Sequence, residues 1–247
     1  MTLIKTKSFE LAVNTKGDQN SVKLAIMLPG RLDTKDYINF LRHMDYLSKR
    51  GFYAIVIDPP GTWESPGDIS LYSTTNYIKA VNELIEYFGN KPTLLLGHSR
   101  GGTVAINVGA KNPNVIGIIS IMATYGKANP PSKEAIKAGV DMSSRDLPPG
   151  DKRPTKQRIF PLPISYFDDS KRYDTLKELM ECRIPKLLFY GDEDSFSTPQ
   201  EVKEIFKQIP EPKMIHELKT KHDYRLFPEA IEEVNKVLGE FLDKYNL

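Results

Sequence analysis

Cysteine and tryptophan are scarce in this sequence, and neither sign of charge predominates. The single cysteine, Cys182, cannot form an internal disulfide, and no CxxC motif or Cys/His cluster offers the spacing of a structural zinc site. The 34 basic and 32 acidic side chains leave a net charge of +2, which is too small for a broad positive field that would attract a phosphate backbone. We therefore expect no metal site, no nucleic-acid partner and a reducing compartment.

Long apolar runs are also missing. No stretch of about 18 apolar residues occurs, and the N-terminal MTLIKTKSFELAV alternates charged and apolar residues in place of the apolar centre of a signal peptide. We expect no membrane span and a cytoplasmic location. A chain from which a signal peptide had been removed would look the same.

Short apolar runs rich in β-branched residues alternate with longer segments whose apolar residues recur at helical spacing. The short runs predict buried strands at residues 24–28, 53–57, 93–96, 116–121, 186–190 and 214–218. The longer segments predict helices at residues 36–49, 73–88, 103–111, 199–208 and 228–245. This alternation favours an α/β fold with a parallel sheet covered by helices, in one domain that spans residues 1–247. Segment 5–13 alternates more cleanly and predicts an edge strand.

Residues 127–178 break this rhythm. Seven prolines lie between residues 127 and 173, which leaves room only for short helices at 132–140 and beyond Ser170. We interpret the segment as a cap or lid, because a long irregular insertion in a compact domain is usually functional or mobile. Its apolar side chains support this interpretation, because they would be unfavourably exposed in a loop that packs against nothing. Phe160 and Phe167 are candidate substrate-binding residues. The alternative is a solvated surface excursion.

The run TLLLGHSRGGTVAINVGA, residues 93–110, predicts a strand, a sharp turn and a helix. A serine at such a turn adopts a strained backbone, and Gly97 and Gly101 on either side of Ser99 relieve the crowding. Ser99 would project from the sheet edge, where the amide of Arg100 and the positive end of the helix face an oxyanion. The alternative is a glycine-rich connection that serves packing, because GxSxG alone is a weak pattern.

These residues resemble the α/β-hydrolase superfamily. The resemblance rests on GHSRGG after an apolar strand, and it extends from Lys23 to Tyr245 with the motifs in the order serine, acid, histidine. It implies a mostly parallel sheet with helices on both faces, a cap after the sixth strand, and hydrolysis through an acyl-enzyme.

The same resemblance implies partners for Ser99. A serine hydroxyl needs a histidine to accept its proton and a carboxylate to orient that histidine. Asp194 matches the family pattern in the turn GDEDSFSTP, with Asp192 as its main competitor. His222 lies in the last loop before a helix, whereas the other three histidines fall on a strand, a helix and the elbow itself: His216, His43 and His98. Lys221 stands where the family usually has glycine.

Two further loops resemble the family less completely. In AIMLPGRLD, Pro29 replaces the usual histidine, and by position the backbone amide of Arg31 should be the second oxyanion donor. Leu32 is the alternative donor and a candidate for substrate contact, and an ordinary turn is the plain alternative. In VIDPPGTWESPGD, Trp63 stands where a second glycine is expected, and it either lines the substrate pocket or packs in the interior.

We expect a carboxylesterase that cleaves small or medium esters and needs no metal or organic cofactor. The same triad can act on an amide, peptide, thioester or carbon–carbon bond, and a non-catalytic binding protein can keep the fold, because the pocket decides the chemistry. Arg31 and Arg100 hint at an anionic substrate, but we favour a structural ion pair for Arg100. The sequence leaves the oligomeric state open.

Overall fold

The computed structural model describes residues 2–126, 128, 130–153 and 156–247. Its main sheet has eight strands in the order β1-β2-β4-β3-β5-β6-β9-β10. The strands of this sheet are β1 (Thr2–Lys5), β2 (Glu10–Lys16), β3 (Leu24–Leu28), β4 (Tyr53–Ile57), β5 (Thr93–His98), β6 (Val115–Ile121), β9 (Lys186–Gly191) and β10 (Lys213–Leu218). The main helices are α1 (Ile38–Lys49), α2 (Thr74–Tyr87), α3 (Arg100–Gly109), α7 (Pro199–Gln208) and α8 (Pro228–Tyr245).

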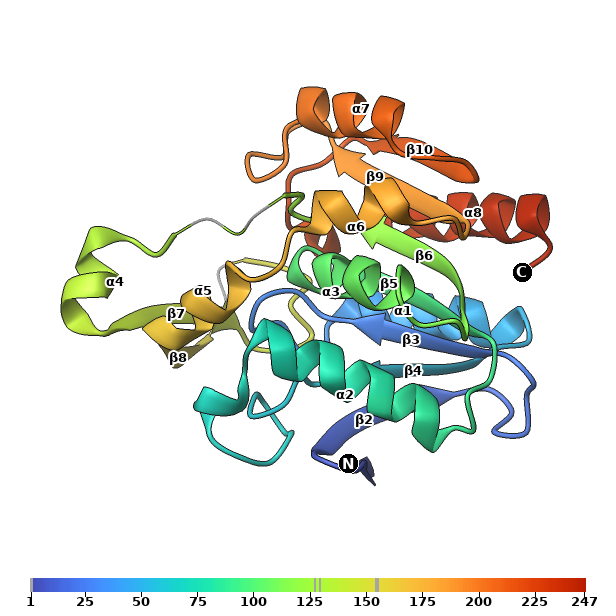
Figure 1. Ribbon diagram of the computed structural model, residues 1–247. Coiled ribbons are helices and arrows are strands. Elements are labelled where there is room, and N and C mark those ends of the chain that lie inside the picture. Colours follow the sequence, from blue (N-terminus) through green and yellow to red (C-terminus); the bar gives the residue numbers. More distant parts are fainter. Residues whose placement is uncertain (1, 127, 129, 154–155) are drawn as a thin grey trace.

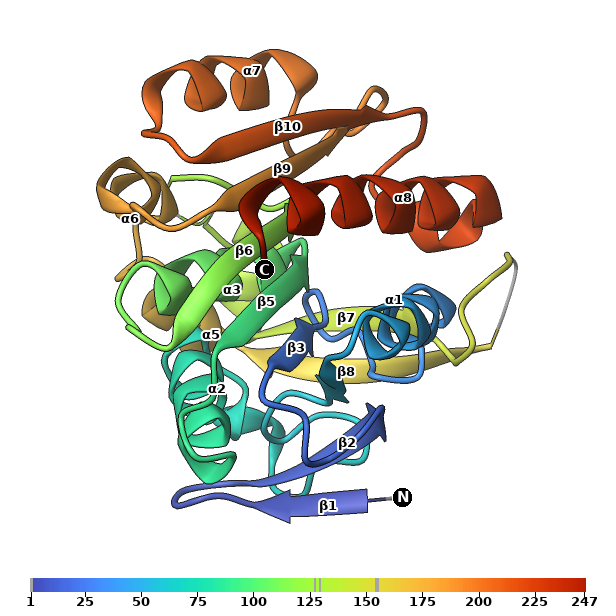
Figure 2. The same cartoon turned by 90° about the vertical axis from the view of Figure 1, so that its right-hand side faces the viewer.

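The central strands pair in parallel, and their apolar side chains are buried on both faces of the sheet. β3, β5 and β9 are buried along their whole length, as expected for continuous apolar runs in a parallel sheet. Helices α2 and α3 cover one face, and α1 and α8 cover the other (Figures 1 and 2). Each face has its own core cluster of aliphatic and aromatic side chains. The predicted α/β architecture is confirmed.

The first strand differs from the prediction. Segment 5–13 forms parts of two antiparallel strands, β1 and β2, in which Ile4 pairs with Leu11. The chain turns between them, where the amide of Thr6 donates to the carbonyl of Phe9 over 2.8 Å. Glu83 of α2 fixes this turn by accepting hydrogen bonds from Thr6 Oγ1 and Ser8 Oγ. The period-2 pattern continues across the turn, which contains no glycine or proline, so the sequence did not indicate it.

The segment between β6 and β9 holds the predicted cap. It contains α4 (Lys133–Ala138), β7 (Val140–Asp146), β8 (Gln157–Pro163), α5 (Ile164–Ser170) and α6 (Thr175–Glu181). The expectation of short helices alone was wrong, because β7 and β8 form an antiparallel ladder from Val140–Pro163 to Asp146–Gln157. Both strands of a two-stranded ladder are edges, which is where proline is tolerated. Residues 127, 129, 154 and 155 of the predicted cap lie outside the described residues.

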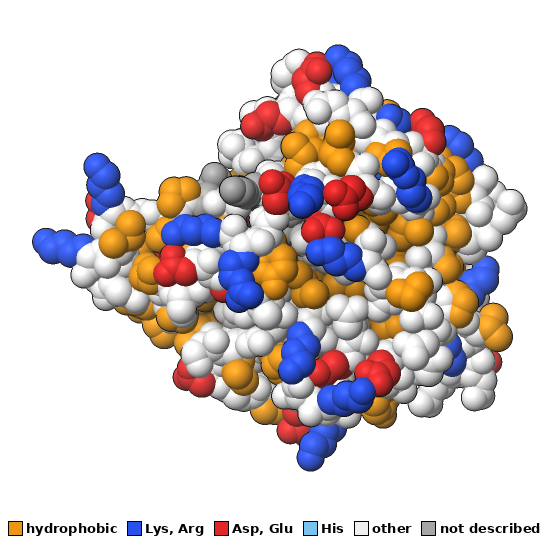
Figure 3. Space-filling view, in the orientation of Figure 1, with side chains coloured by type: hydrophobic (Ala, Val, Ile, Leu, Met, Phe, Trp, Pro, Cys, Tyr) orange, Lys and Arg blue, Asp and Glu red, His pale blue; other side chains and the backbone are white. Residues whose placement is uncertain are grey.

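The hairpin and α4 project to one side of the sheet, whereas α6 returns to the body (Figures 1 and 3). The ring of Tyr166 in α5 stacks on Tyr72 of the body, with 5.2 Å between the centroids, and Leu179 of α6 is buried in the core. Basic and acidic side chains are interspersed over the face in Figure 3. Within the described ranges, no helix is both long and apolar enough to cross a bilayer.

Candidate active site

Ser99 lies at the turn between β5 and α3, at the carboxyl edge of the sheet. Its backbone has φ 51° and ψ −118°, which is strained for a residue with a side chain. Glycines make the turn possible: a Cβ at Gly97 would lie 2.2 Å from the carbonyl oxygen of Gly101, and one at Gly101 would lie 1.8 Å from that of Leu28. The turn is anchored where the Ser99 amide donates to the carbonyl of Ile121 over 2.9 Å.

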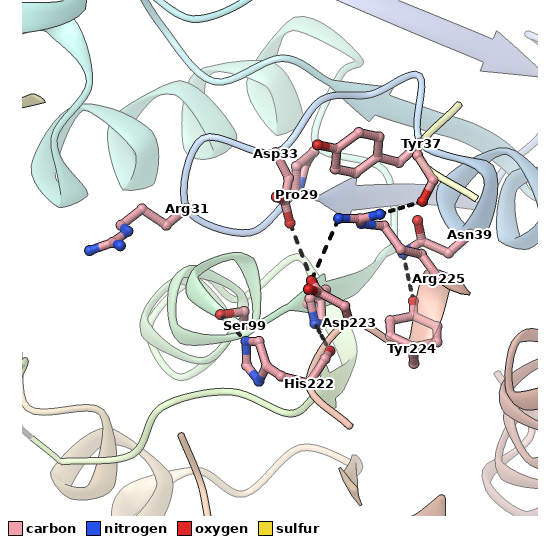
Figure 4. Close-up of polar contacts among 12 residues, drawn as sticks. Pro29, Arg31, Asp33, Tyr37, Asn39, Ser99, His222, Asp223, Tyr224 and Arg225 are labelled. Carbon is pink, nitrogen blue, oxygen red and sulfur yellow. Dashed lines mark hydrogen bonds and ion pairs between the residues drawn. The ribbon is translucent and has the colours of Figure 1, made fainter. Parts of the chain in front are cut away.

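Three side chains from three segments form a continuous hydrogen-bonded chain at this edge. The Ser99 Oγ lies 2.9 Å from Nε2 of His222, and Nδ1 of His222 lies 3.0 and 3.1 Å from the two carboxylate oxygens of Asp194. An ionised carboxylate can only accept, so Nδ1 carries the proton and Nε2 is left to accept the hydrogen bond from the Ser99 hydroxyl. Figure 4 shows Ser99 facing the imidazole of His222.

The carboxylate of Asp194 is fully buried at the end of β9. Burial raises its pKa, but the hydrogen bond to His222 and the backbone amides of Phe196 and Ser197 outweigh this and hold the pKa below its ordinary value. Asp194 is therefore ionised at neutral pH. The competing residue Asp192 lies 3.5 Å from the ammonium of Lys219, outside the chain of hydrogen bonds.

Two backbone amides near Ser99 are free to bind an anion. The amides of Arg31 and Arg100 make no hydrogen bond to any residue that the structure describes. Leu32, the alternative donor, is excluded because its amide donates to the hydroxyl of Tyr72 over 3.1 Å. The carbonyl of Arg31 accepts from Nε of Arg145 over 2.6 Å, so the cap strand β7 holds this loop. The Arg100 amide also lies at the positive end of α3.

A cavity of about 360 Å³ opens beside Ser99 and His222, between the body and the cap. Of the predicted substrate-binding residues, Phe167 lines this cavity. Leu32, Trp63 and Phe160 do not, so their predicted contact with substrate is not supported by their placement. Leu32 and Phe160 are buried, and the ring of Trp63 packs against Phe160 at 5.3 Å while its indole N–H donates to the carbonyl of Leu32. Trp63 therefore takes the packing role that the sequence left open.

The sequence matches a family model of the alpha/beta hydrolase fold over residues 25–145. The chain has the alpha/beta hydrolase fold. A sequence comparison with curated proteins gives no match.

Solved structures with this fold cover nearly the whole chain. The alpha/beta hydrolase domain-containing protein 10 from mouse is 20% identical, with a TM-score of 0.76 over 98% of both chains. A monoacylglycerol lipase from Paleococcus ferrophilus is 21% identical, with a TM-score of 0.73 over 95% of this chain and 99% of that one. Est1E from Butyrivibrio proteoclasticus, with ferulic acid bound, is 14% identical, with a TM-score of 0.74 over 99% of both chains. At this identity the likeness establishes the fold.

His98, the residue before Ser99, supports the loop that carries His222. Its Nε2 donates to the carbonyl of His222 over 3.0 Å, and its Nδ1 lies 3.5 Å from Asp33. Asp33 also lies 3.4 Å from Nε of Arg145. Burial raises the pKa of Asp33, but His98 and Arg145 hold it below the ordinary value, so the carboxylate is charged. The prediction that His98 is structural agrees with this placement.

Several residues at the site were not identified from the sequence. The ring of Phe196 lies 4.6 Å from that of His222 and is 65% exposed, so it covers the imidazole from the solvent side. The signal available in the sequence was an aromatic residue in a polar turn, two positions after Asp194. Asp146 and Arg225 pair at 2.7 Å across the cap and body, and no local pattern links residues so far apart.

The predicted ion pair of Arg100 is also wrong. Its guanidinium lies over the ring of Tyr166, 5.5 Å from the centroid, and pairs with no carboxylate among the described residues. Elsewhere, Asp36, Asp58 and Glu64 lie close enough together to hold a cation. The ammonium of Lys35 already lies 2.6 Å from Asp36 and 2.7 Å from Glu64, so two of the three carboxylates are paired with a cationic side chain.

Proposed function

We propose that this protein is a serine hydrolase that cleaves small or medium carboxylic esters through an acyl-enzyme. One observation carries the proposal: the hydroxyl of Ser99 is hydrogen-bonded to His222, which is in turn oriented by the buried carboxylate of Asp194. The hydrogen bonds place Nε2 of His222 to accept the proton of the Ser99 hydroxyl, and the carboxylate of Asp194 orients the imidazole, as this reaction needs.

The residues have separate roles in the proposed reaction. Ser99 Oγ attacks the ester carbonyl while His222 Nε2 takes its proton, and the tetrahedral oxyanion accepts hydrogen bonds from the amides of Arg31 and Arg100. His222 then donates the proton to the leaving alcohol. A water molecule, deprotonated by His222, attacks the acyl-enzyme and releases the acid. Removing one such amide donor costs about 3 to 4 kcal/mol of barrier in comparable sites.

The cavity and the relatives support an ester of modest size. A volume of about 360 Å³ suits a small ligand enclosed by the cap. One structural relative is described as a monoacylglycerol lipase and another as a thioesterase domain from the curacin biosynthetic pathway. Both names describe acyl transfer to water, which is the chemistry proposed for Ser99.

The test combines a covalent probe with a substrate series. Wild type, Ser99→Ala and the control Ser70→Ala, an exposed serine outside the site, are treated with a fluorophosphonate and with p-nitrophenyl esters of increasing acyl length. We expect Ser99→Ala to lose labelling and at least about a thousandfold in turnover, and Ser70→Ala to behave as wild type. The optimum acyl length then gives the size of the pocket.

Two results would contradict the proposal. A folded wild-type protein that neither labels nor hydrolyses any ester would favour a non-catalytic binding protein. A kcat/KM for the thioester or amide of the same acyl group that greatly exceeds the value for the ester would keep the triad and change the substrate class.

A further inference from the structure

The side chains that line the cavity include more arginines than carboxylates. Five arginines and three aspartates line it. Three of the arginines have a carboxylate partner within the cavity wall. These pairs are Arg145–Asp33 at 3.4 Å, Arg225–Asp146 at 2.7 Å and Arg153–Asp223. The two remaining arginines are Arg31 and Arg100, and neither pairs with a carboxylate in the part of the chain that the structure describes.

The two unpaired arginines belong to one assembly beside Ser99. The guanidinium of Arg100 lies over the ring of Tyr166, which stacks on Tyr72. The hydroxyl of Tyr72 accepts a hydrogen bond from the amide of Leu32, the residue after Arg31. Both arginines are half-buried and line the same cavity as Ser99. In Figure 4 the side chain of Arg31 points away from Asp223 and Arg225, so it takes no part in their ion pairs.

A second polar group on this wall also lacks a partner. The hydroxyl of Tyr166 is buried and makes no hydrogen bond to any described residue, and Tyr166 lines the cavity. Half-buried guanidinium groups without a counter-charge lose solvation, and the contact of Arg100 with the ring of Tyr166 offsets this loss only in part. On the surface at large, by contrast, the two signs of charge are interspersed (Figure 3).

We infer that the substrate carries an anionic group, a carboxylate or a phosphate, that Arg31 and Arg100 bind beside the scissile ester. This rests on the proposed function and narrows its substrate class. A guanidinium donates two parallel hydrogen bonds to either anion, which fixes its orientation as well as its position. The anionic group stays ionised throughout, and the bond that breaks is the ester bond attacked by Ser99.

Matched pairs of substrates test the inference. The first pair places a carboxylate on the acyl side, p-nitrophenyl hydrogen glutarate against p-nitrophenyl valerate. The second places a phosphate on the alcohol side, 1-butyrylglycerol 3-phosphate against 1-butyrylglycerol. We expect a kcat/KM at least about tenfold higher for the anionic member of one pair, the size of one charge-assisted hydrogen bond. The pair that shows this preference identifies the bound group as a carboxylate or a phosphate.

Variants then assign the preference to the two arginines. Arg31→Gln and Arg100→Gln keep both backbone amides, and each should lower the anionic-to-neutral ratio of kcat/KM by about tenfold. The ratio is the readout because a disturbed oxyanion site would affect both members of a pair. Lysine at either position should retain part of the preference. The control is Arg42→Gln, which removes the same charge from an exposed position on α1 and should leave the ratio unchanged.

Failure of the inference is distinct from failure of the proposed function. If Ser99 is labelled and neutral esters are preferred in both pairs, or if neither arginine variant changes the ratio, the esterase stands and the anion site is wrong. If nothing is labelled or hydrolysed, the esterase is wrong, and calorimetric titration with glutarate and with inorganic phosphate decides the rest. Binding that weakens in both variants would retain the anion site, and no binding would overturn it.

Discussion

At the scale of single residues, the site depends on small side chains that allow close backbone contacts. Gly101 brings α3 against the carbonyl of Leu28, so that the loop containing Arg31 and the start of α3 meet at Ser99. Because only glycine fits these positions, the elbow leaves a clear mark in the sequence. Ser99 was predicted for this reason, whereas Asp194 and His222 were predicted from the family pattern, in the turn after a strand and in the loop before the last helix.

His98 offers a test of how the site is held. Replacing His98 with alanine removes the hydrogen bond to the carbonyl of His222 and frees the loop that carries the imidazole. We expect kcat to fall about fivefold to tenfold, which corresponds to about 1 kcal/mol, while KM changes little. The rate of fluorophosphonate labelling should fall in parallel.

The conservative variant separates positioning from packing. His98→Gln retains an N–H donor and should recover part of the lost kcat. A variant that unfolds at lower urea concentration but keeps the wild-type kcat and labelling rate would show that His98 only packs.

At the scale of elements, the cap strand β7 is part of the site. Arg145 in β7 holds the carbonyl of Arg31, and Asp146 next to it pairs with Arg225 of the body. The hydroxyl of Tyr37 donates to the carbonyl of Asp146 over 2.7 Å. The end of β7 thus connects the cap, the loop that contains Arg31 and the segment that follows His222.

The Asp146–Arg225 pair predicts a local response to mutation. The two side chains are 3% and 4% exposed, and removing one member of such a buried pair costs about 3 to 5 kcal/mol. We expect Asp146→Asn to raise hydrogen exchange in β7 and β8 and to leave the amides of β5 protected. The measurement is exchange followed by mass spectrometry.

The double variant Asp146→Asn with Arg225→Met completes the test. It should exchange more slowly in β7 and β8 than Asp146→Asn alone, because no unpaired charge is left buried. Unchanged exchange in the cap, or an equal rise throughout the sheet, would contradict a local tie between cap and body.

The elements also show what the sequence could predict. Helix α7 was predicted with its correct bounds from the helical spacing of its apolar residues. In the structure a capping box of Thr198 with Glu201, and Pro199 in the first turn, stabilise its start. The β7–β8 hairpin was missed, because VDMSSRD lacks an apolar run and QRIFPLP contains two prolines. Contacts with distant residues stabilise it, and such contacts leave no local pattern.

At the scale of the whole molecule, buried polar groups join two helices on one face of the sheet to the site. His43 of α1 donates from Nδ1 to Asn235 of α8 over 2.6 Å, and its Nε2 lies 2.8 Å from the hydroxyl of Tyr224. Asn39 donates to the same hydroxyl. Tyr224 follows His222 by two residues, so this chain of hydrogen bonds links the helices to the catalytic loop of the proposed hydrolase. Only a neutral imidazole satisfies it.

This chain of hydrogen bonds makes the stability of the fold depend on pH. Burial lowers the pKa of His43 to about 4, against about 6.5 in the unfolded chain. Between these values the unfolded state binds a proton that the folded state does not, so the free energy of unfolding falls as pH falls. The stabilisation of the folded state by the neutral imidazole of His43 is complete above pH 6.5 and is lost by about pH 4. From pH 7 to pH 4.5 we expect about 2 kcal/mol to be lost through His43.

Urea unfolding of wild type and His43→Gln at pH 7.0 and pH 4.5 measures this loss. The difference between the two proteins cancels the contributions of the other histidines and the carboxylates, because these groups are common to both. At pH 7 the free energy of unfolding of His43→Gln should be lower than that of wild type, because the variant lacks the neutral imidazole. This difference between the two proteins should narrow by about 2 kcal/mol at pH 4.5. An equal difference in the free energy of unfolding at both pH values would mean that His43 takes up its proton in the folded state as readily as in the unfolded chain. The buried chain of hydrogen bonds would then not exclude the charge.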